Sequence, residues 1–334
     1  MESTTLGRGG PVVSRMGLGM MGMSGIYGPA DDAESIATIR AAIDAGITLL
    51  DTGDFYGMGH NEMLLGSALR EVPRDSVFVQ VKFGAQRDPA GGFVGHDASP
   101  AAVKTSLAYS LRRLGTDYVD LYQSARLDPN VPIEDTVGAI AEMITAGYVR
   151  YAGLSEMGVE TIRRAQAVHP IAAFQIEYSL MSRGIEGSLL PFVREQGIAV
   201  TAYGVLSRGL LSPATARLAG PADPRIRFPR FREPNLAQNL GLVAALEQIA
   251  AERGATAAQL AIAWVLTRGS DIIPLIGTKR RDRLAEALGA LELTLTADEL
   301  AAIETAVPTS AVAGDRYDEH GMAILDSEPS AAGT

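Results

Sequence analysis

Eight short apolar runs, separated by amphipathic segments, constrain the fold of this chain more than any other feature. The runs cover residues 12–20, 47–51, 77–83, 118–123, 149–155, 172–178, 198–204 and 271–277. Runs that are apolar on both faces are typical of parallel strands buried between other layers. Because strands and helical patterns alternate, we expect right-handed crossovers. Eight such units in 334 residues predict an α/β fold of the closed (β/α)8 TIM barrel type.

The helical patterns between the runs carry start and stop signals. Asp31 or Asp32 is the expected N-cap of a helix that ends before Gly46, and Ser99 followed by Pro100 begins another. We expect a single barrel domain over residues 1–334. A long Pro- and Arg-rich loop at 212–235 follows the seventh strand, and a tail at about 308–334 is expected to lie over the pocket.

Composition narrows the classes of partner. The formal net charge of −10 and the pI near 5.0 argue against nucleic acid or an anionic membrane, since both attract basic surfaces. The chain has no cysteine, its four histidines are scattered, and no metal site is expected. No apolar stretch reaches membrane-spanning length, so we expect a cytoplasmic protein that acts on small molecules. Monomer and homo-oligomer both remain open.

Residues 17–22, GLGMMG, match the G-x-G-x-x-G fingerprint of dinucleotide-binding doubly wound sheets. In that fingerprint the glycines open a helix directly, so that the helix N-terminus meets the pyrophosphate. Here the loop continues through MSGIYGPA before any plausible helix. We therefore interpret these glycines as a strand-to-loop turn.

Polar residues interrupt the ends of the apolar runs, which is where a barrel of this type gathers its functional side chains. The second run leads into LLDTGDFYG and the third ends in VKFG, which places Asp51, Tyr56 and Lys82 at one rim. Each of them alone could be structural, as a turn cap, a loop aromatic or a cation that reaches solvent. Their joint order is hard to explain by packing, so we interpret them as functional residues.

From GLGMMGMSGIYG to the GDRY that ends at residue 317, these motifs resemble those of the aldo-keto reductase superfamily. The resemblance implies a (β/α)8 barrel that binds a nicotinamide dinucleotide and reduces carbonyls with hydride. It identifies Asp51, Tyr56 and Lys82 as the catalytic residues.

The resemblance also implies NADPH or NADP as cofactor. Ser155 of GLSE and Gln175 would hold the nicotinamide carboxamide, and Tyr203 of TAYG would stack on the nicotinamide ring. The other cofactor-binding residues that it implies are Gly19, Met20, Asp51, Leu206, Gly209, Gly277, Thr278, Lys279, Arg280, Arg283 and Glu286. Ala287 stands where the family has Asn, which leaves one adenine contact open.

Elementary chemistry supports the catalytic roles. Carbonyl reduction needs a proton donor for the oxygen, and a phenol with a pKa near 10 is a weak acid unless its environment changes it. An ammonium at Lys82 would favour the phenolate and lower the pKa of Tyr56, while Asp51 would keep the lysine charged.

Three cations follow the eighth run in an otherwise acidic chain. Lys279, Arg280 and Arg283 stand at the start of a predicted helix, where cations oppose the helix dipole. A bound anion explains them, and the 2′-phosphate of NADP is the answer that the resemblance implies. The alternative is a solvated run of charge.

Ala125 is the main departure from the family pattern, because most members have a His there that donates to the substrate oxygen. Loss of one such donor costs about 10²–10³ in rate. Gln123, two residues earlier on the same strand face, is our candidate replacement, directly or through a water. Arg126 is expected to point away and to pair with Asp128. His60 either lines the pocket mouth or is structural.

The sequence therefore predicts an NADPH-dependent oxidoreductase that reduces a small-to-medium aldehyde or ketone. Two alternatives stay open at Ala125. One is an imine or enone reductase that uses the enlarged pocket. The other is a slow, redox-sensing NADP-binding subunit.

Overall fold

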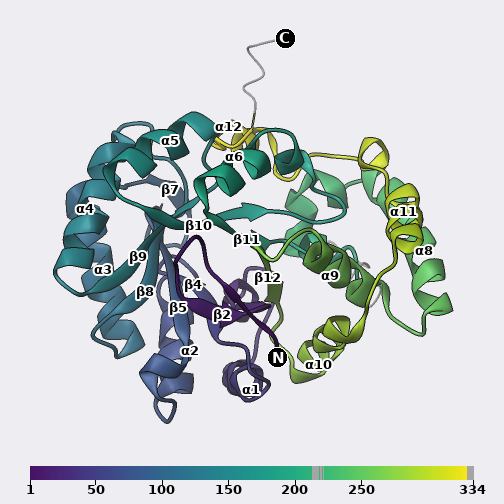
Figure 1. Cartoon of the computed structure of the whole chain (residues 1–334), viewed down its shortest axis with the longest axis horizontal. Coiled ribbons are helices and arrows are strands. Elements are labelled where there is room, and N and C mark those ends of the chain that lie inside the picture. Colours follow the sequence, from purple (N-terminus) through teal and green to yellow (C-terminus); the bar gives the residue numbers. More distant parts are fainter. Residues whose placement is uncertain (213–217, 219, 221, 329–334) are drawn as a thin grey trace.

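Eight parallel strands close into a barrel in the computed structural model, which describes residues 1–212, 218, 220 and 222–328 (Figure 1). Around the barrel, each strand is hydrogen-bonded to the next in the order β10-β11-β12-β3-β4-β5-β8-β9. The strands are β3 (Gly17–Gly19), β4 (Leu49–Gly53), β5 (Phe78–Phe83), β8 (Val119–Ser124), β9 (Val149–Ser155), β10 (Ile171–Glu177), β11 (Ala199–Tyr203) and β12 (Ile272–Gly277). The predicted (β/α)8 barrel is confirmed.

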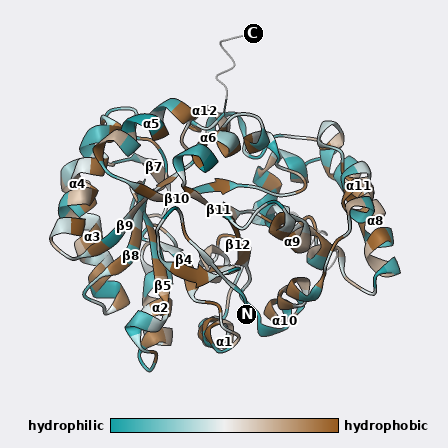
Figure 2. Cartoon of the chain, viewed as in Figure 1, coloured by the Kyte–Doolittle hydropathy of each residue, from teal (hydrophilic) through white to brown (hydrophobic). Residues whose placement is uncertain are grey.

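Helices cover the outside of the barrel (Figure 1). They are α1 (Asp32–Asp44), α2 (His60–Leu69), α3 (Pro100–Leu114), α4 (Ile133–Thr145), α5 (Val159–Val168), α6 (Leu189–Gln196), α8 (Asn235–Glu252), α9 (Ala257–Thr267), α10 (Arg281–Leu288), α11 (Ala297–Ala306) and α12 (Glu319–Ala323). In Figure 2 the strands are mainly apolar, whereas the outer helices alternate apolar and polar residues. This pattern fits strands buried between side chains of the barrel interior and of the helices.

Local signals set the ends of these helices. The side chain of Asp31 accepts from the backbone N–H of Glu34, and Gly46 has a φ of 89° just beyond the end of α1. The hydroxyl of Ser99 accepts from the N–H of Ala102 at the start of α3. Of the two candidate caps named for the first helix, Asp31 is the one used.

The first apolar run was expected as one strand over residues 12–20, and that prediction is wrong. It forms β2 (Val12–Ser14), which pairs antiparallel with β1 (Ser3–Thr5), and then the barrel strand β3. The chain turns at Ser14, whose Oγ accepts from the N–H groups of Thr48 and Leu49. Leu6 and Val13 pack on the lower barrel interior, so the hairpin closes the end where the strands begin.

A second hairpin, which the sequence did not predict, follows β5. It consists of β6 (Ala85–Arg87) and β7 (Phe93–His96) and extends the chain beyond the carboxyl end of that strand. Between β3 and α1 stands only the short 3-10 turn at Met21–Ser24, so the glycines at 17–22 do not open a helix, as expected.

The loop at 212–235 falls partly outside the described residues, namely at 213–217, 219 and 221, and the tail does so at 329–334. The described part of the loop ends in two 3-10 turns, at Pro224–Arg227 and Pro229–Phe231, before α8 begins. Within the described ranges, none of the helices combines the length and the apolar character that crossing a bilayer requires.

Candidate active site

Asp51 and Lys82 form a buried ion pair inside the carboxyl end of the barrel. Asp51 lies on β4 and Lys82 on the neighbouring β5, and Lys82 Nζ is 2.6 Å from Asp51 Oδ1. The same oxygen accepts from Gln175 Nε2 at 2.8 Å and from Gln80 Nε2 at 3.0 Å. Side chains of a strand alternate between its faces, so Gln80 and Lys82 both point inward. Gln80 was missed, although that alternation in FVQVKF could have identified it.

Tyr56 follows β4 in the next loop, where its ring is 5 % exposed and its centroid lies 5.1 Å from Lys82 Nζ. Burial of the phenol, followed by the Asp51 carboxylate, raises the pKa of Tyr56 well above 10. The net change in this pKa is thus opposite to the lowering that was expected from a charged Lys82. Burial also lowers the pKa of Lys82, and Asp51 opposes that change.

A set of hydrogen bonds fixes the loop that carries Tyr56. Thr52 Oγ1 donates to Asn61 Oδ1, and Asn61 Nδ2 donates to the carbonyl of Met20 and to Ser24 Oγ, each at 2.8 Å. His60, at the first position of α2, contacts Ser24 Oγ through Nδ1 and Asp32 through Nε2. These contacts give His60 a bracing position between α2 and the loop after β3.

Gln123 and Ala125 lie at the carboxyl end of β8. Gln123 is neighbour to Lys82 in the β5–β8 register and is fully buried, and neither amide atom has a hydrogen-bond partner among the described residues. Buried polar groups are seldom left unpaired, so this amide is available to a ligand or a water. Ala125, 3 % exposed, donates its N–H to the carbonyl of Phe83.

The expected pair between Arg126 and Asp128 does not form. Arg126 Nη1 donates to the carbonyl of Ala125 at 2.6 Å and Nη2 to the hydroxyl of Tyr317 at 3.3 Å. Asp128 instead accepts from the backbone N–H groups of Ala98 and Asn130. The prediction failed because β8 ends at Ser124, after which strand alternation no longer decides where a side chain points.

The residues assigned to the nicotinamide end meet beside the ion pair. Ser155 Oγ, at the end of β9, is buried without a partner among the described residues, as expected of a group reserved for a ligand. Gln175, on β10, already contacts Asp51. The hydroxyl of Tyr203, at the end of β11, donates to Glu156 Oε1 at 2.6 Å and lies 2.9 Å from that of Tyr317. The tail thus reaches the site, as predicted.

A second buried charge network closes this rim. Glu156 binds both terminal nitrogens of Arg316 at 2.9 Å, and Glu177 pairs with Arg208 at 3.0 Å and Arg230 at 3.4 Å. Burial acts to raise the pKa of Glu156, but Arg316 outweighs it and holds this pKa at about 2. Sequence reasoning missed these residues. Glu156 and Glu177 belong to the strand-end motifs GLSE and FQIEYS, which could have identified them.

The other assigned cofactor residues line β3, β11 and β12. Gly19 is the register partner of Gly277. Leu206 precedes the 3-10 turn at Ser207–Gly209 that follows β11, and Gly209 is the last residue of that turn. Thr278 stands between Gly277 and the cations that precede α10, and its hydroxyl hydrogen-bonds with the backbone of Arg280.

The three cations expected around a phosphate differ in their surroundings. Arg280 pairs with Asp282 and Arg283 with Glu286, so these two are partly neutralised. Lys279 makes no ion pair within the described part of the chain, and its Nζ donates to the carbonyls of Gly28 and Pro29. Burial lowers the pKa of Lys279. Lys279 is therefore the cation best placed to take an anionic ligand.

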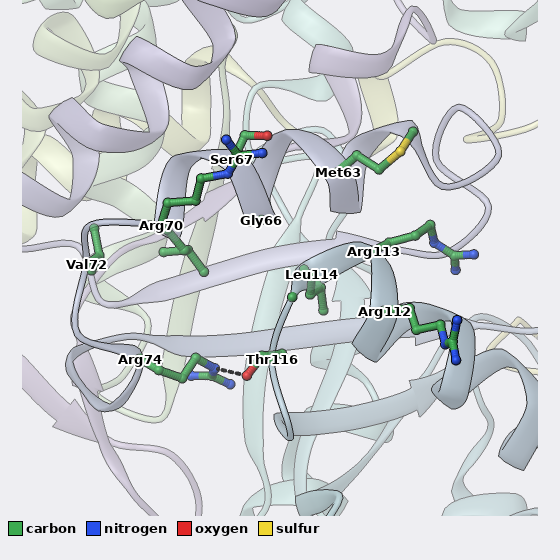
Figure 3. Close-up of a pocket in the computed structure, with 12 residues that line it drawn as sticks. Met63, Gly66, Ser67, Arg70, Val72, Arg74, Arg112, Arg113, Leu114 and Thr116 are labelled. Atoms are coloured by element: carbon green, nitrogen blue, oxygen red, sulfur yellow. Dashed lines mark hydrogen bonds between the residues drawn. The ribbon is translucent and has the colours of Figure 1, made fainter.

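A surface groove of about 770 Å³ between α2 and α3 lies away from this rim (Figure 3). It is lined at the ends of the two helices, among others by Arg70, Arg74, Arg112 and Arg113. Because both helices run opposite to the strands, these ends lie where the strands begin, and that end of a barrel serves stability. Among the described residues, no cluster of His, Asp or Glu could hold a metal ion.

The fold and this site define a (β/α)8-barrel protein with its polar groups gathered at the strand carboxyl ends. The model of the Aldo/keto reductase family matches residues 15–308. Over 321 residues the chain is 40% identical to the probable aldo-keto reductase 1 of Glycine max, which covers 95% of this chain and 92% of that protein. The chain belongs to the aldo/keto reductase family and is thus an oxidoreductase.

Two solved structures are similar in fold. The glycerol dehydrogenase from Gluconobacter oxydans superposes with a TM-score of 0.82 at 30% identity, covering 91% of this chain and 94% of that one. A thermostable aldo-keto reductase, solved with the inhibitor epalrestat, gives a TM-score of 0.74 at 29% identity, with 92% and 100% covered. These likenesses agree with the barrel architecture.

Proposed function

We propose that this protein reduces the carbonyl of a small-to-medium aldehyde or ketone with NADPH, and that Tyr56 donates the proton. The observation that carries the proposal is the buried Asp51–Lys82 ion pair directly beside Tyr56. NADPH, when bound, supplies a hydride to the carbonyl carbon. Tyr56 passes its hydroxyl proton to the oxygen, so that a C–H and an O–H bond form, and Tyr56 is reprotonated from solvent.

The residues present fit this cofactor. The unpartnered Ser155 Oγ suits an amide, and Lys279 suits a phosphate. Asp51 holds the Lys82 ammonium in place, and Lys82 in turn stabilises negative charge that develops on Tyr56 during proton transfer. Gln123, with its free amide, is the candidate donor to the substrate oxygen beside Ala125. Alcohol oxidation would use the same atoms in reverse.

The test is Tyr56→Phe, measured by NADPH consumption on a panel of aldehydes and ketones. We expect turnover to fall about 10²–10⁴-fold, the usual contribution of a general acid. NADPH affinity, followed by fluorescence titration, reports whether the variant remains folded. Retention of more than roughly a tenth of native turnover would contradict the role of Tyr56.

The same panel separates the alternatives at Ala125. If the native protein reduces cyclic imines or enones but no carbonyl, the protein is an imine or enone reductase and the proposal is wrong. Native protein that binds NADPH tightly and turns over none of these substrates would favour a sensing subunit.

A further inference from the structure

Arg126 lies where it can act on the reacting group. It follows Ala125 directly, just past the end of β8, and its side chain is half-buried. Its guanidinium donates to the hydroxyl of Tyr317, which lies 2.9 Å from that of Tyr203 at the end of β11, so the guanidinium lies at the carboxyl rim of the barrel. Its positive charge also acts to lower the pKa of both Tyr56 and Lys82. Arg126 therefore lies next to Ala125, the position at which most members of the family have a His.

The hydrogen bonds of Arg126 give it no carboxylate partner. They go to a backbone carbonyl and to a neutral phenol, those of Ala125 and Tyr317. Within the described ranges, Arg126 forms no ion pair with a carboxylate. Burial acts to lower the pKa of Arg126, but Tyr317, Tyr203 and Glu156 outweigh it and raise this pKa. Both oxygens of Glu156 accept hydrogen bonds from Arg316.

The neighbouring arginines show the contrast. Arg208 stacks between Phe228 and Tyr317 and is neutralised by Glu177, and Arg316 is neutralised by Glu156. Withdrawing an arginine from water without a counter-ion is costly, so such a group is expected to gain its anion from a ligand. The planar guanidinium matches carboxylate and phosphate oxygens in geometry.

We propose that Arg126 binds an anionic group, carboxylate or phosphate, on the substrate whose carbonyl is presented to Tyr56. The natural substrate is then an oxo acid or a phosphorylated aldehyde or ketone, with the anion a few bonds from the carbonyl. This inference rests on the proposed reductase function and specifies its substrate class.

The experiment compares substrates that differ in charge and little in shape. The carboxylate pairs are 4-oxobutanoate with 4-oxobutanamide and 3-formylbenzoate with 3-formylbenzamide. The phosphate pair is 4-formylphenyl phosphate with 4-methoxybenzaldehyde. We expect the native protein to favour at least one charged partner by about tenfold or more in kcat/KM, mainly through KM. The pair with the larger ratio identifies the anion.

Arg126→Gln should bring that ratio close to one, and Arg126→Lys should keep part of it, because lysine retains the charge without the planar fork. The matched control is Tyr317→Phe, which removes the hydroxyl that Arg126 contacts and keeps the ring. If Arg126 merely anchors the tail, this control should reduce the ratio as Arg126→Gln does. If Arg126 binds substrate, the control should preserve it.

Besides a Tyr317→Phe variant that loses the ratio, two further results would overturn the inference. One is a native protein that reduces the neutral and charged partners equally well. The other is an Arg126→Gln variant that loses activity on both partners in proportion. A native protein that reduces no carbonyl in any pair would instead contradict the proposed function itself, so the two failures are distinguishable.

Discussion

Two buried charge networks meet at the carboxyl rim of the barrel, and they are built differently. The Asp51 network draws all its members from strands, with one anion, one cation and the amides of Gln80 and Gln175. The Glu156–Glu177 network joins strand ends to the loop after β11 and to the tail through Arg208, Arg230 and Arg316.

The difference between these networks indicates that they have different roles. Strand residues are held by backbone hydrogen bonds on both sides, which suits groups that must keep their geometry during a reaction. Residues on loops and tails hold their places only through the contacts that they make. We infer that the first network positions the proton transfer, whereas the second holds the segments that surround the substrate.

The largest expected effect lies in the first network. Lys82→Met should lower kcat for carbonyl reduction by about 10²–10⁴, because the charge that favours proton release from Tyr56 is lost. Lys104→Met is the matched control, since Lys104 forms an exposed pair with Glu142 on the outer surface. If steady-state kinetics gave the two variants the same kcat, the proposed role of the first network in proton transfer would be wrong.

The second network should govern stability. Glu156→Gln leaves the buried Arg316 undercompensated and should cost about 3–5 kcal/mol in the free energy of unfolding, measured with a chemical denaturant. Glu328→Gln is the control, because Glu328 pairs with the same arginine at the more exposed end and should cost about 0–1 kcal/mol. Equal losses would show that burial does not distinguish the two contacts.

The same pair predicts a pH dependence. The pKa of Glu156 is about 2 in the folded protein, below the 4.5 of an unperturbed Glu. Unfolded chains then bind the proton first as the pH falls, so the stabilisation is complete above about pH 4.5 and is lost between there and about pH 2. In Glu156→Gln, the unfolding free energy should change less with pH over this window.

A smaller effect is expected at the exposed end of the proposed cofactor site. Lys279→Ala should weaken NADPH binding about 10- to 100-fold and leave NADH nearly unchanged, because one charged contact to a phosphate is lost. Arg281→Ala is the control, since Arg281 is engaged by Glu34 of α1. Equal affinity of the native protein for the two cofactors, by fluorescence titration, would remove the basis of this prediction.

The smallest effect concerns the position without a functional group. Ala125→His should raise kcat/KM for small aldehydes about tenfold, less than a full donor because no surrounding groups orient the new imidazole. Bulky substrates should lose affinity. Ala125→Leu adds bulk without a donor and should lower kcat/KM for small and bulky substrates alike. If Ala125→His gave the same kcat/KM values as Ala125→Leu, the interpretation of Ala125 as a vacated donor position would be wrong.

Much of this protein can be predicted from the sequence, because the residues concerned belong to regular elements. Repeating apolar runs are enough to predict a parallel barrel, and the order of Asp51, Tyr56 and Lys82 along it brings them to one rim. There Lys82 pairs with Asp51 and lies 5.1 Å from the centroid of the Tyr56 ring. Strand geometry transmits sequence position directly into space.

Only the tertiary structure decided what lies beyond the strand ends. Arg126 hydrogen-bonds to the tail at Tyr317 and not to Asp128, because the chain bends once β8 is over. The pKa of Tyr56 is raised, because the ring is buried and the Asp51 carboxylate lies close to it. Arg316 and Tyr317 meet Glu156 and Tyr203 across more than a hundred residues, and no local pattern encodes contacts of that kind. The periodicity of the sequence determines where side chains point within a strand or helix. The positions of loop residues and of buried charged side chains depend on how the elements pack together.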